Sequence, residues 1–489
     1  MNAKRTPRVV VIGAGLSGLV TAWKLLQRVP RGSVDLTVCE GSSRPGGNVS
    51  TERVGGYVLD GGPDSWVSAK PDATELCRAL GLGDRLVETL PGNRRAFLLH
   101  RGKLEPLPEG LLMGVPTSPV AMARTPLVSW PGKLRMGLDL VLPRRHPSKP
   151  DESLGALVAR RLGREAAEAL AEPILAGVYA GDAWALSSRA TFPQLVAMED
   201  ADRSLILSAL RQRRRAPKRA TPPSIFTSLE GGVGTLVEAL LRALPEGTVR
   251  TGLRVSGVAR LSDEDPRGRW AVEVDGNPTF FADHVALAAP MHRAARVLKG
   301  MSALSEALGK VPFGSAATVF FALDRRQVPH PLDGTGFLIP RREGLGLLAS
   351  TWASSKWPGR APPGKVLLRG FLGGAGRAEV VEQSDEALTT AARRELWRLL
   401  QIRGEPELTR VFRFRQATAQ PLPGHREQVK AIHDAAADAE GLHLLGAAYD
   451  GVGIPDVVRL ALKTADRIAD ALPLKVPSVS PSSGPPAPR

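Results

Sequence analysis

The sequence predicts an α/β fold, and three observations support this class. The β-branched run Val9–Ile12 is typical of a buried parallel strand, and a helix predicted over Ser17–Gln27 follows it directly. A second apolar run at Val34–Glu40 completes a strand–helix–strand unit. Further buried strands are predicted at Asp283–Pro290 and just after Gly441. With 489 residues, 43% of them hydrophobic, the chain is long enough for about two or three domains.

The turn between the first strand and its helix carries three glycines in GxGxxG spacing. Gly13 allows the tight turn, Gly15 lets the backbone approach a pyrophosphate, and Gly18 lets the helix pack on the strand. The positive end of the helix then faces the phosphates. Glu40, 22 residues beyond Gly18, stands where an acid binds a ribose hydroxyl pair, and an acid there disfavours the 2′-phosphate of NADP. A Rossmann-like domain that binds a dinucleotide is therefore predicted.

The segment after the second strand, EGSSRPGG at Glu40–Gly47, resembles the R-x-G-G element of the flavin amine oxidase superfamily. Arg44 would add charge beside a pyrophosphate, and the glycine pair would let the backbone pass close to a flat ligand. By the same resemblance, strands within Gly247–Leu261 bring the backbone of Val255 to the adenine. The strand, turn and helix of Gly441–Leu472 would then lie by the pyrophosphate and flavin, although an alanine stands where an Asn is common. The resemblance implies non-covalent FAD.

The most specific stretch is EPILAGVYAGDAWALSSRATFPQL at Glu172–Leu195. Its GVYAGD resembles a hallmark of the protoporphyrinogen oxidase family of oxygen-dependent flavoproteins. Gly61–Ala73 resembles that family's GPNSF-type segment, and Phe97–Pro108 resembles the strand and turn before its membrane-associated region. Gly334–Pro362 is similar to part of its substrate-side sheet. The order of these pieces extends the resemblance over most of the chain, from Val9 to about Leu472.

The resemblance also implies a substrate site. The backbone near Ala176 and Gly177 would contact a pyrrole ring, and the side chains of Leu338 and Trp357 would sandwich another ring. Without the resemblance, Leu338 and Trp357 could equally be ordinary sheet core. A propionate needs a cation, for which Arg95 is the candidate, although a solvent-facing arginine is an equal alternative. No catalytic side chain is assigned, because flavin N5 would abstract the hydride and no strong general base is required.

The implied reaction is the six-electron oxidation of protoporphyrinogen IX to protoporphyrin IX in haem biosynthesis, with dioxygen as acceptor. One alternative is oxidation of coproporphyrinogen III to coproporphyrin III by the same fold. An amine oxidase is disfavoured because residues 425–473 contain no Cys for a covalent flavin and the chain has three Tyr for an aromatic cage. A carotenoid desaturase is disfavoured by GVYAGD. A non-catalytic flavin- or porphyrin-binding protein also remains open.

The complete predicted site has two parts and no metal ligand. The predicted cofactor-binding residues are Gly13, Gly15, Leu16, Ser17, Gly18, Glu40, Arg44, Gly46, Gly47, Gly61, Gly62, Pro63, Val255, Gly446, Ala447, Val452, Gly453 and Ile454. The predicted substrate-binding residues are Arg95, Ala176, Gly177, Leu338 and Trp357.

Charge and composition limit the partners. The net charge is +16, and its densest cluster, Arg211–Arg219, lacks the interleaved aromatics of a single-strand binder, so nucleic acid is not expected. The two cysteines, Cys39 and Cys77, fit a reducing cytoplasm. The sequence has no run of about 20 apolar residues, so no segment is expected to span a bilayer. Leu111–Leu142 mixes apolar residues with Lys133 and Arg135, which predicts a peripheral contact with the inner face of the cytoplasmic membrane. A homodimer is a further expectation.

These observations predict a Rossmann-like FAD-binding domain, a mixed-sheet substrate domain and a helical membrane-associated lobe. The FAD-binding domain is expected to comprise residues 1–88, 228–304 and 425–473. The substrate-binding domain is expected to comprise residues 89–95, 206–227 and 305–424. The helical lobe is expected at 96–205, and residues 474–489 are expected to be a disordered tail.

Overall fold

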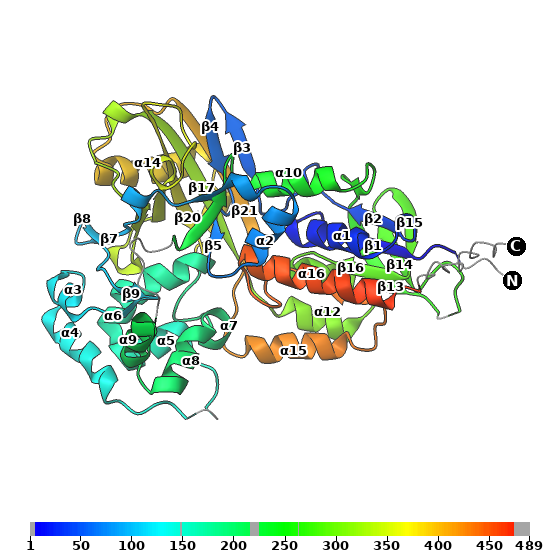
Figure 1. Ribbon diagram of the computed structural model, residues 1–489, viewed down its shortest axis with the longest axis horizontal. Coiled ribbons are helices and arrows are strands. Elements are labelled where there is room, and N and C mark those ends of the chain that lie inside the picture. Colours follow the sequence, from blue (N-terminus) through cyan, green and yellow to red (C-terminus); the bar gives the residue numbers. More distant parts are fainter. Residues whose placement is uncertain (1–4, 147–148, 216–223, 263, 474–489) are drawn as a thin grey trace, which may run out of the picture.

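The computed structural model describes residues 5–146, 149–215, 224–262 and 264–473. The predicted tail at 474–489 lies outside the described residues. The molecule has three parts, a parallel sheet with its helices, a larger mixed sheet and a helical lobe (Figure 1). The predicted α/β class with a mixed sheet is confirmed.

The parallel sheet has five strands in the order β12-β2-β1-β16-β22. All four pairings are parallel, and β1 lies at the centre because its apolar residues pair with β2 on one side and β16 on the other. The strands are β1 (Arg8–Ile12), β2 (Asp35–Cys39), β12 (Val249–Arg250), β16 (His284–Leu287) and β22 (Leu442–Leu444). Three distant parts of the chain therefore build one sheet.

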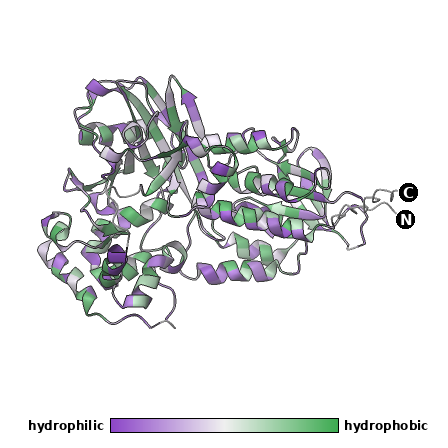
Figure 2. Ribbon diagram, in the orientation of Figure 1, coloured by the Kyte–Doolittle hydropathy of each residue, from purple (hydrophilic) through white to green (hydrophobic). Residues whose placement is uncertain are grey.

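Helices cover both faces of this sheet. One face carries α1 (Leu16–Arg28), α2 (Asp72–Ala79), α10 (Gly234–Ala243) and α16 (Ile454–Ala471). The other carries α11 (Met291–Val297), α12 (Ser302–Gly309), α15 (His425–Ala435) and the antiparallel sheet β13 (Val255–Arg260), β14 (Trp270–Val274) and β15 (Asn277–Ala282). Hydrophobic and hydrophilic residues alternate along α1 and α16, as expected of helices that bury one face (Figure 2).

The mixed sheet has seven strands in the order β21-β17-β20-β19-β18-β7-β8. All its pairings are antiparallel except β18 with β7. The helix α14 (Asp385–Leu400) packs on its apolar face. The strands are β7 (Phe97–His100), β8 (Lys103–Pro106), β17 (Phe313–Asp324), β18 (Gly336–Leu338), β19 (Leu347–Trp352), β20 (Lys365–Gly373) and β21 (Leu408–Ala419). The domain limits stay a prediction, and β7 and β8, which were expected at the start of the helical lobe, pair within this sheet.

Short elements connect these parts. The hairpin β3 (Thr51–Val54) with β4 (Tyr57–Asp60) and the small sheet β5 (Trp66–Val67), β11 (Phe226–Leu229) and β6 (Leu86–Glu88) lie between the two large sheets in the chain path. The helix α13 (Ala353–Lys356) follows β19.

The lobe between β8 and β11 is mostly helical. It contains β9 (Leu111–Leu112), β10 (Val115–Pro116), α3 (Pro119–Arg124), α4 (Trp130–Gly137), α5 (Leu154–Leu162), α6 (Arg164–Ala166), a π-helical segment (Ala167–Ala176), α7 (Ser188–Thr191), α8 (Pro193–Asp202) and α9 (Leu205–Arg215). Among the described residues, no helix has both the length and the apolar character to cross a bilayer.

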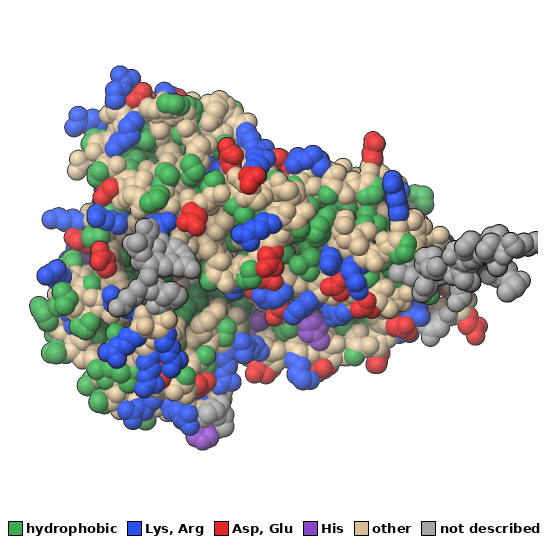
Figure 3. All heavy atoms as spheres, viewed as in Figure 1, with side chains coloured by type: hydrophobic (Ala, Val, Ile, Leu, Met, Phe, Trp, Pro, Cys, Tyr) green, Lys and Arg blue, Asp and Glu red, His purple; other side chains and the backbone are tan. Residues whose placement is uncertain are grey.

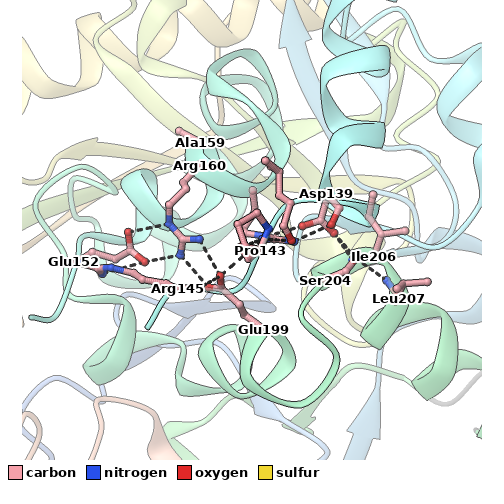
Figure 4. A network of polar contacts seen from close by, with 12 residues as sticks. Asp139, Pro143, Arg145, Glu152, Ala159, Arg160, Glu199, Ser204, Ile206 and Leu207 are labelled. Atoms are coloured by element: carbon pink, nitrogen blue, oxygen red, sulfur yellow. Dashed lines mark hydrogen bonds and ion pairs between the residues drawn. The ribbon is translucent and has the colours of Figure 1, made fainter. Parts of the chain in front are cut away.

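Asp139 belongs to a network of polar contacts within this lobe (Figure 4) and forms a buried ion pair there. The Arg161 side chain and Asp139 are fully buried, and Arg161 Nε donates to Asp139 Oδ1 at 2.5 Å. The second oxygen of Asp139 accepts hydrogen bonds from Ser204 Oγ and from the backbone N–H of Ile206. Each charge thus has hydrogen-bond partners, which burial of an ion pair requires.

Candidate active site

In the first glycine turn, the packing of the protein leaves no room for a side chain at two of the glycines, but it does leave room at the third. Gly13 has a positive φ of 102°, and a Cβ there would lie 2.7 Å from the carbonyl oxygen of Ala288. A Cβ on Gly18 would lie 2.0 Å from the carbonyl oxygen of Gly13. A Cβ on Gly15, in contrast, would have no closer neighbour than Gly47 Cα at 4.0 Å. The space next to Gly15 is therefore free of protein atoms and could hold part of a ligand.

Two helices begin at this place without a side-chain cap. Gly15 is the N-cap of α1, Gly453 is the N-cap of α16, and neither end has a side-chain acceptor. The helices pack together, and Thr21 Oγ1 donates to the carbonyl of Ala461 at 3.3 Å. The free N–H groups of the first turn of α1, including those of Leu16, Ser17 and Gly18, are suited to bind a pyrophosphate. These glycines and helix ends fit FAD.

The acid in the first turn of α16 is neutralised by neighbouring cations. Asp456 is paired with Lys70 Nζ at 2.7 Å and with Arg459 Nη2 at 2.9 Å. Val452 and Gly453 are half-buried and lead directly into Ile454 at the start of the helix. A negative charge near this helix end would oppose a phosphate, and the two cations remove that opposition.

Glu40 lies at the end of β2, as predicted, and already has three donors. Its Oε2 accepts from the N–H of Ala14 at 2.8 Å, and Oε1 accepts from the N–H and the hydroxyl of Ser42. A carboxylate has about four acceptor positions, so about one stays free for a ribose hydroxyl. The N–H of Leu253 donates to the carbonyl of Glu40 at 2.9 Å, which brings the chain just before Val255 alongside. The ribose and adenine roles of Glu40 and Val255 stay predictions.

Arg44 shapes the turn that contains Gly46 and Gly47. Its guanidinium donates to the carbonyls of Val49 and Gly47, both at 2.9 Å, and its side chain lies at the surface. Gly46 has a φ of +109° and forms a bridge with Gly15. The structure therefore brings the two predicted glycine segments together. These hydrogen bonds do not test the predicted contact of Arg44 with a pyrophosphate, which stays a prediction.

The turn Gly61–Pro63 is packed from several sides. A Cβ on Gly61 would lie 2.4 Å from the ring of Phe412, and a Cβ on Gly62 would lie 1.8 Å from the carbonyl oxygen of Asn48. Arg369 on β20 donates from one nitrogen to the carbonyls of Gly61 and Gly62, at 2.6 and 2.7 Å. Arg369 was not among the predicted residues. The signal for it was a charge in the middle of the otherwise apolar run 366–373.

The carboxy-terminal turn departs from regular geometry where the sequence departs from the usual motif. Gly446 has a φ of +135°, and Ala448 has a φ of +87°, which is rare for a residue with a Cβ. The ring nitrogen Nε2 of His425 lies 2.8 Å from the carbonyl oxygen of Ala448 and helps to hold it. Ala447 between them is half-buried. Asp450 forms an ion pair with Arg459.

Two of the predicted substrate residues lie together. A Cβ on Gly177 would lie 3.8 Å from Leu338 Cδ2, so the GVYAGD segment rests against β18 of the mixed sheet. Ala176 ends the π-helical segment just before it. Arg341 fastens the far end of GVYAGD, because its guanidinium donates to Asp182 Oδ2 at 3.0 Å and to the carbonyl of Gly181 at 3.2 Å. π-Helical turns are frequent at functional sites.

The other two predicted substrate residues have different surroundings. Trp357 is 1% exposed, and its indole N–H donates to Asp64 Oδ2 at 3.1 Å. The side chain of Arg95 is 70% exposed and lies 3.5 Å from Asp333. The burial of Trp357 is compatible with the alternative that it is an ordinary core residue. The exposure of Arg95 is compatible with the alternative that it is a solvent-facing arginine. Their roles toward a substrate stay predictions.

The two cysteines are unsuited to covalent attachment of a flavin. Both are buried, and burial raises the pKa of the Cys39 thiol to about 11 and that of the Cys77 thiol to about 12. A nucleophilic thiolate is therefore scarce at neutral pH.

Comparisons with known proteins agree with this geometry. The family model described as "Flavin containing amine oxidoreductase" matches residues 16–469. The chain is 35% identical to "Coproporphyrinogen III oxidase" of Bacillus subtilis (strain 168), over 92% of this chain and 95% of the relative. It is 32% identical to "Protoporphyrinogen oxidase, chloroplastic" of Oryza sativa subsp. japonica, over 96% of this chain and 90% of the relative.

A solved structure extends the likeness to three dimensions. The crystal structure of a candidate protoporphyrinogen oxidase from Exiguobacterium sp. 255-15 is similar with a TM-score of 0.85 and 31% identity, over 96% of this chain and 100% of that one. The glycine turn, the two uncapped helix ends and these matches together identify the cofactor as FAD. The chain is an FAD-dependent oxidoreductase and belongs to the flavin-containing amine oxidoreductase family.

Proposed function

We propose that the chain oxidises protoporphyrinogen IX to protoporphyrin IX in haem biosynthesis. Six electrons and six protons leave the substrate, and three molecules of dioxygen become three of hydrogen peroxide. The observation that carries the proposal is the near full-length likeness to relatives named as porphyrinogen oxidases, of which the rice protein is one. The contact between Gly177 and Leu338 supports it, because both are predicted to face the macrocycle.

The chain's own residues would bind and orient the substrate. FAD supplies the acceptor for hydride when it is bound. Gly177 has no side chain, and Leu338 is apolar and half-buried, so together they suit the face of a flat, largely apolar ring. Arg341 would hold the GVYAGD segment in place through Asp182. Arg95 at the surface is the proposed cation for a propionate, and Arg95→Gln should raise KM more than it lowers kcat.

Coproporphyrinogen III is a second candidate substrate. The Bacillus subtilis relative, 35% identical, is named for it. The two substrates differ in carboxylate number, four propionates against two, so the choice would depend on cations at the mouth of the site.

The test uses the purified protein with its bound flavin, under air, with each porphyrinogen in turn. Porphyrin fluorescence reports product, and oxidation without protein gives the autoxidation rate. Saturable turnover with a higher kcat/KM for protoporphyrinogen IX supports the proposal, and a higher kcat/KM for coproporphyrinogen III selects the second candidate. If flavin is bound and neither substrate exceeds autoxidation, the proposed function is wrong.

We also propose that the outer face of α4 and the turn after it rests on a membrane surface on the cytoplasmic side. Trp130, Leu134, Leu138 and Val141 are exposed there, Leu134 by 74%, although they are large and apolar. Lys133 Nζ lies 4.6 Å over the ring of Trp130, so a cation accompanies them. Hydrophobic and basic side chains mix over this part of the lobe (Figure 3). An apolar face with basic charge is typical of interfacial binding.

Co-sedimentation with vesicles of phosphatidylcholine, with and without phosphatidylglycerol, tests this surface. Leu134→Gln should reduce the bound fraction several-fold, whereas Val67→Gln, which changes an exposed apolar residue outside the lobe, should not. Equal binding by both variants would contradict the proposal. A homodimer stays a prediction.

A further inference from the structure

A group of five charged side chains, four of them buried and Asp64 half-buried, lies behind the turn Gly61–Pro63, and the proposed reaction does not use it. It consists of two carboxylates, Asp60 and Asp64, and three cations, Lys356, Arg360 and Arg369. We call these five residues the charge cluster. All of them except Lys356 line a small cavity together with Phe320 and Trp357, and the cavity is of a size that suits one water molecule.

Within the charge cluster, each carboxylate has its own cation. Asp64 Oδ2 lies 2.9 Å from Lys356 Nζ, and Asp60 Oδ2 lies 3.1 Å from Arg360 Nη2. Burial acts to raise the pKa of Asp64, but Lys356 and Arg369 outweigh it and hold that pKa below its usual range. Asp64 is therefore ionised at neutral pH. Arg369 is the cation without a carboxylate partner of its own among the described residues.

Arg369 remains charged although it is buried. It is 5% exposed, and burial lowers its pKa to about 10, with Asp64 and Asp60 acting in the opposite direction. Its guanidinium lies over the rings of Phe371, at 4.4 Å, and Phe320, at 5.5 Å. At pH 7 the charge cluster thus contains three positive and at most two negative charges. Its net charge is at least +1, in surroundings where water screens little.

Arg369 also fixes the backbone that is predicted to meet the flavin. Its Nη2 donates to both glycine carbonyls, and Thr318 Oγ1 donates to that of Gly61 at 3.0 Å. Phe412 packs against Gly61 and the backbone of Asn48 packs against Gly62, so the turn is enclosed on other sides as well. The positive charge is therefore held at hydrogen-bond distance from the turn itself. A fixed charge near the flavin ring changes how readily the flavin accepts electrons.

We propose that Arg369 is a positioning residue that clamps Gly61 and Gly62 and, through the net positive charge of the cluster, favours the reduced, anionic form of the flavin. This inference rests on the predicted position of the flavin against this turn, and not on which porphyrinogen is the substrate. It assigns to Arg369 and Asp64 opposite effects on the reduction potential. Arg369 raises the potential, and Asp64 lowers it.

The experiment measures the flavin midpoint potential of the FAD-bound protein against reference dyes, without any porphyrinogen. Arg369→Gln should shift the equilibrium tenfold toward oxidised flavin, which is about 30 mV for a two-electron couple. Asp64→Asn, which keeps the shape of the side chain, should shift it in the opposite direction. Arg326→Gln removes the same charge from a side chain that is 90% exposed, and should leave the potential unchanged.

The opposite signs of the two potential shifts distinguish an effect of charge from a loss of structure at the turn. A purely structural role would loosen the turn in both variants and shift both potentials the same way, which would overturn the inference, as would two unchanged potentials. Arg369→Lys keeps the charge but loses the fork, so it should keep the potential and increase the Kd for FAD. Because dyes replace the substrate, a failed porphyrinogen assay with opposite potential shifts would refute the proposed substrate and leave the role of Arg369 standing.

Discussion

Substitution of two glycines only three residues apart should separate folding from cofactor binding. Gly15 has a φ of −69° and a ψ of 176°, which any residue adopts, and an added methyl would have no protein atom closer than 4.0 Å. Gly15→Ala should therefore leave the apoprotein about as stable as before, because a gain of about 0.4–1 kcal/mol through the unfolded state is opposed by the lower preference for Ala at a helix N-cap. The methyl would occupy the space in which we expect the pyrophosphate.

The same change at Gly18 should have the opposite profile. Its added methyl would lie 2.0 Å from the Gly13 carbonyl oxygen and 3.1 Å from Val11 Cγ1, so backbone has to move. Overpacking of this kind costs about 1–3 kcal/mol. Gly18→Ala should lower the free energy of unfolding of the apoprotein by that amount, and the loss of FAD affinity should follow from the displaced turn.

Two assays resolve the pair. Urea unfolding of the apoproteins gives the free energy of unfolding, and quenching of flavin fluorescence on titration gives the Kd for FAD. For Gly15→Ala we expect a Kd higher by about 5- to 150-fold, which corresponds to a clash of about 1–3 kcal/mol. If Gly15→Ala binds FAD like the unchanged protein, the pyrophosphate does not approach Gly15 and the assignment of this turn is refuted.

Three further predictions concern other parts of the molecule. Asp139→Asn removes the nearer of the two carboxylates of buried Arg161, leaving Glu199 at 3.7 Å, and should lower the free energy of unfolding by up to about 3–5 kcal/mol, whereas Glu168→Gln, which breaks an exposed pair, should change it by less than about 0.5 kcal/mol. Burial, followed by His284 and Arg467, lowers the pKa of His443 to about 3, so the unfolded state binds the extra proton and stability should fall as pH drops below about 6.5. His443→Gln should flatten that slope. Trp357→Phe should lower the melting temperature, because Asp64 loses an indole donor.

Each of these has a contradicting result. Equal effects of Asp139→Asn and Glu168→Gln in urea unfolding would show that the buried pair is not the stronger one. A pH–stability curve between pH 4 and 7 that is the same for His443→Gln and the unchanged protein would exclude His443 as a contributor. An unchanged melting temperature for Trp357→Phe would mean that the indole hydrogen bond adds nothing.

The sequence predicts the first strand–helix–strand unit and its glycine turn well because these are local. The strand at Val9–Ile12, the helix after it and the spacing of Gly13 and Gly18 lie within a few residues. Gly18 is required by the carbonyl oxygen of Gly13 in the same turn, and Gly13 by its own positive φ, although Ala288, just after a distant strand, also leaves no room for a Cβ there. The strands at 284–287 and 442–444 are short apolar runs between turn residues, which the pattern also indicates.

The charge cluster could not be predicted, because its members are far apart in sequence. Arg369 lies 308 residues from Gly61, and only the pairing of the mixed sheet places β20 behind that turn. For the same reason the sequence could not decide whether Trp357 faces a substrate or a buried carboxylate. A one-residue shift along a strand reverses the direction of a side chain, and this limits the assignment of Arg95 as well.

The path of the chain through the parallel sheet has a consequence for synthesis. Val9 of β1 pairs with His284 of β16, and Val285 of β16 pairs with Leu442 of β22. The central strand β1 is therefore synthesised long before β16 and β22. At about 5–20 residues per second, a ribosome needs roughly 20–90 s to make the chain between β1 and β22. Throughout that time the apolar face of α1 lacks α16, against which it later packs. The nascent chain therefore exposes this strand and the apolar face of α1 until β22 and α16 have been made.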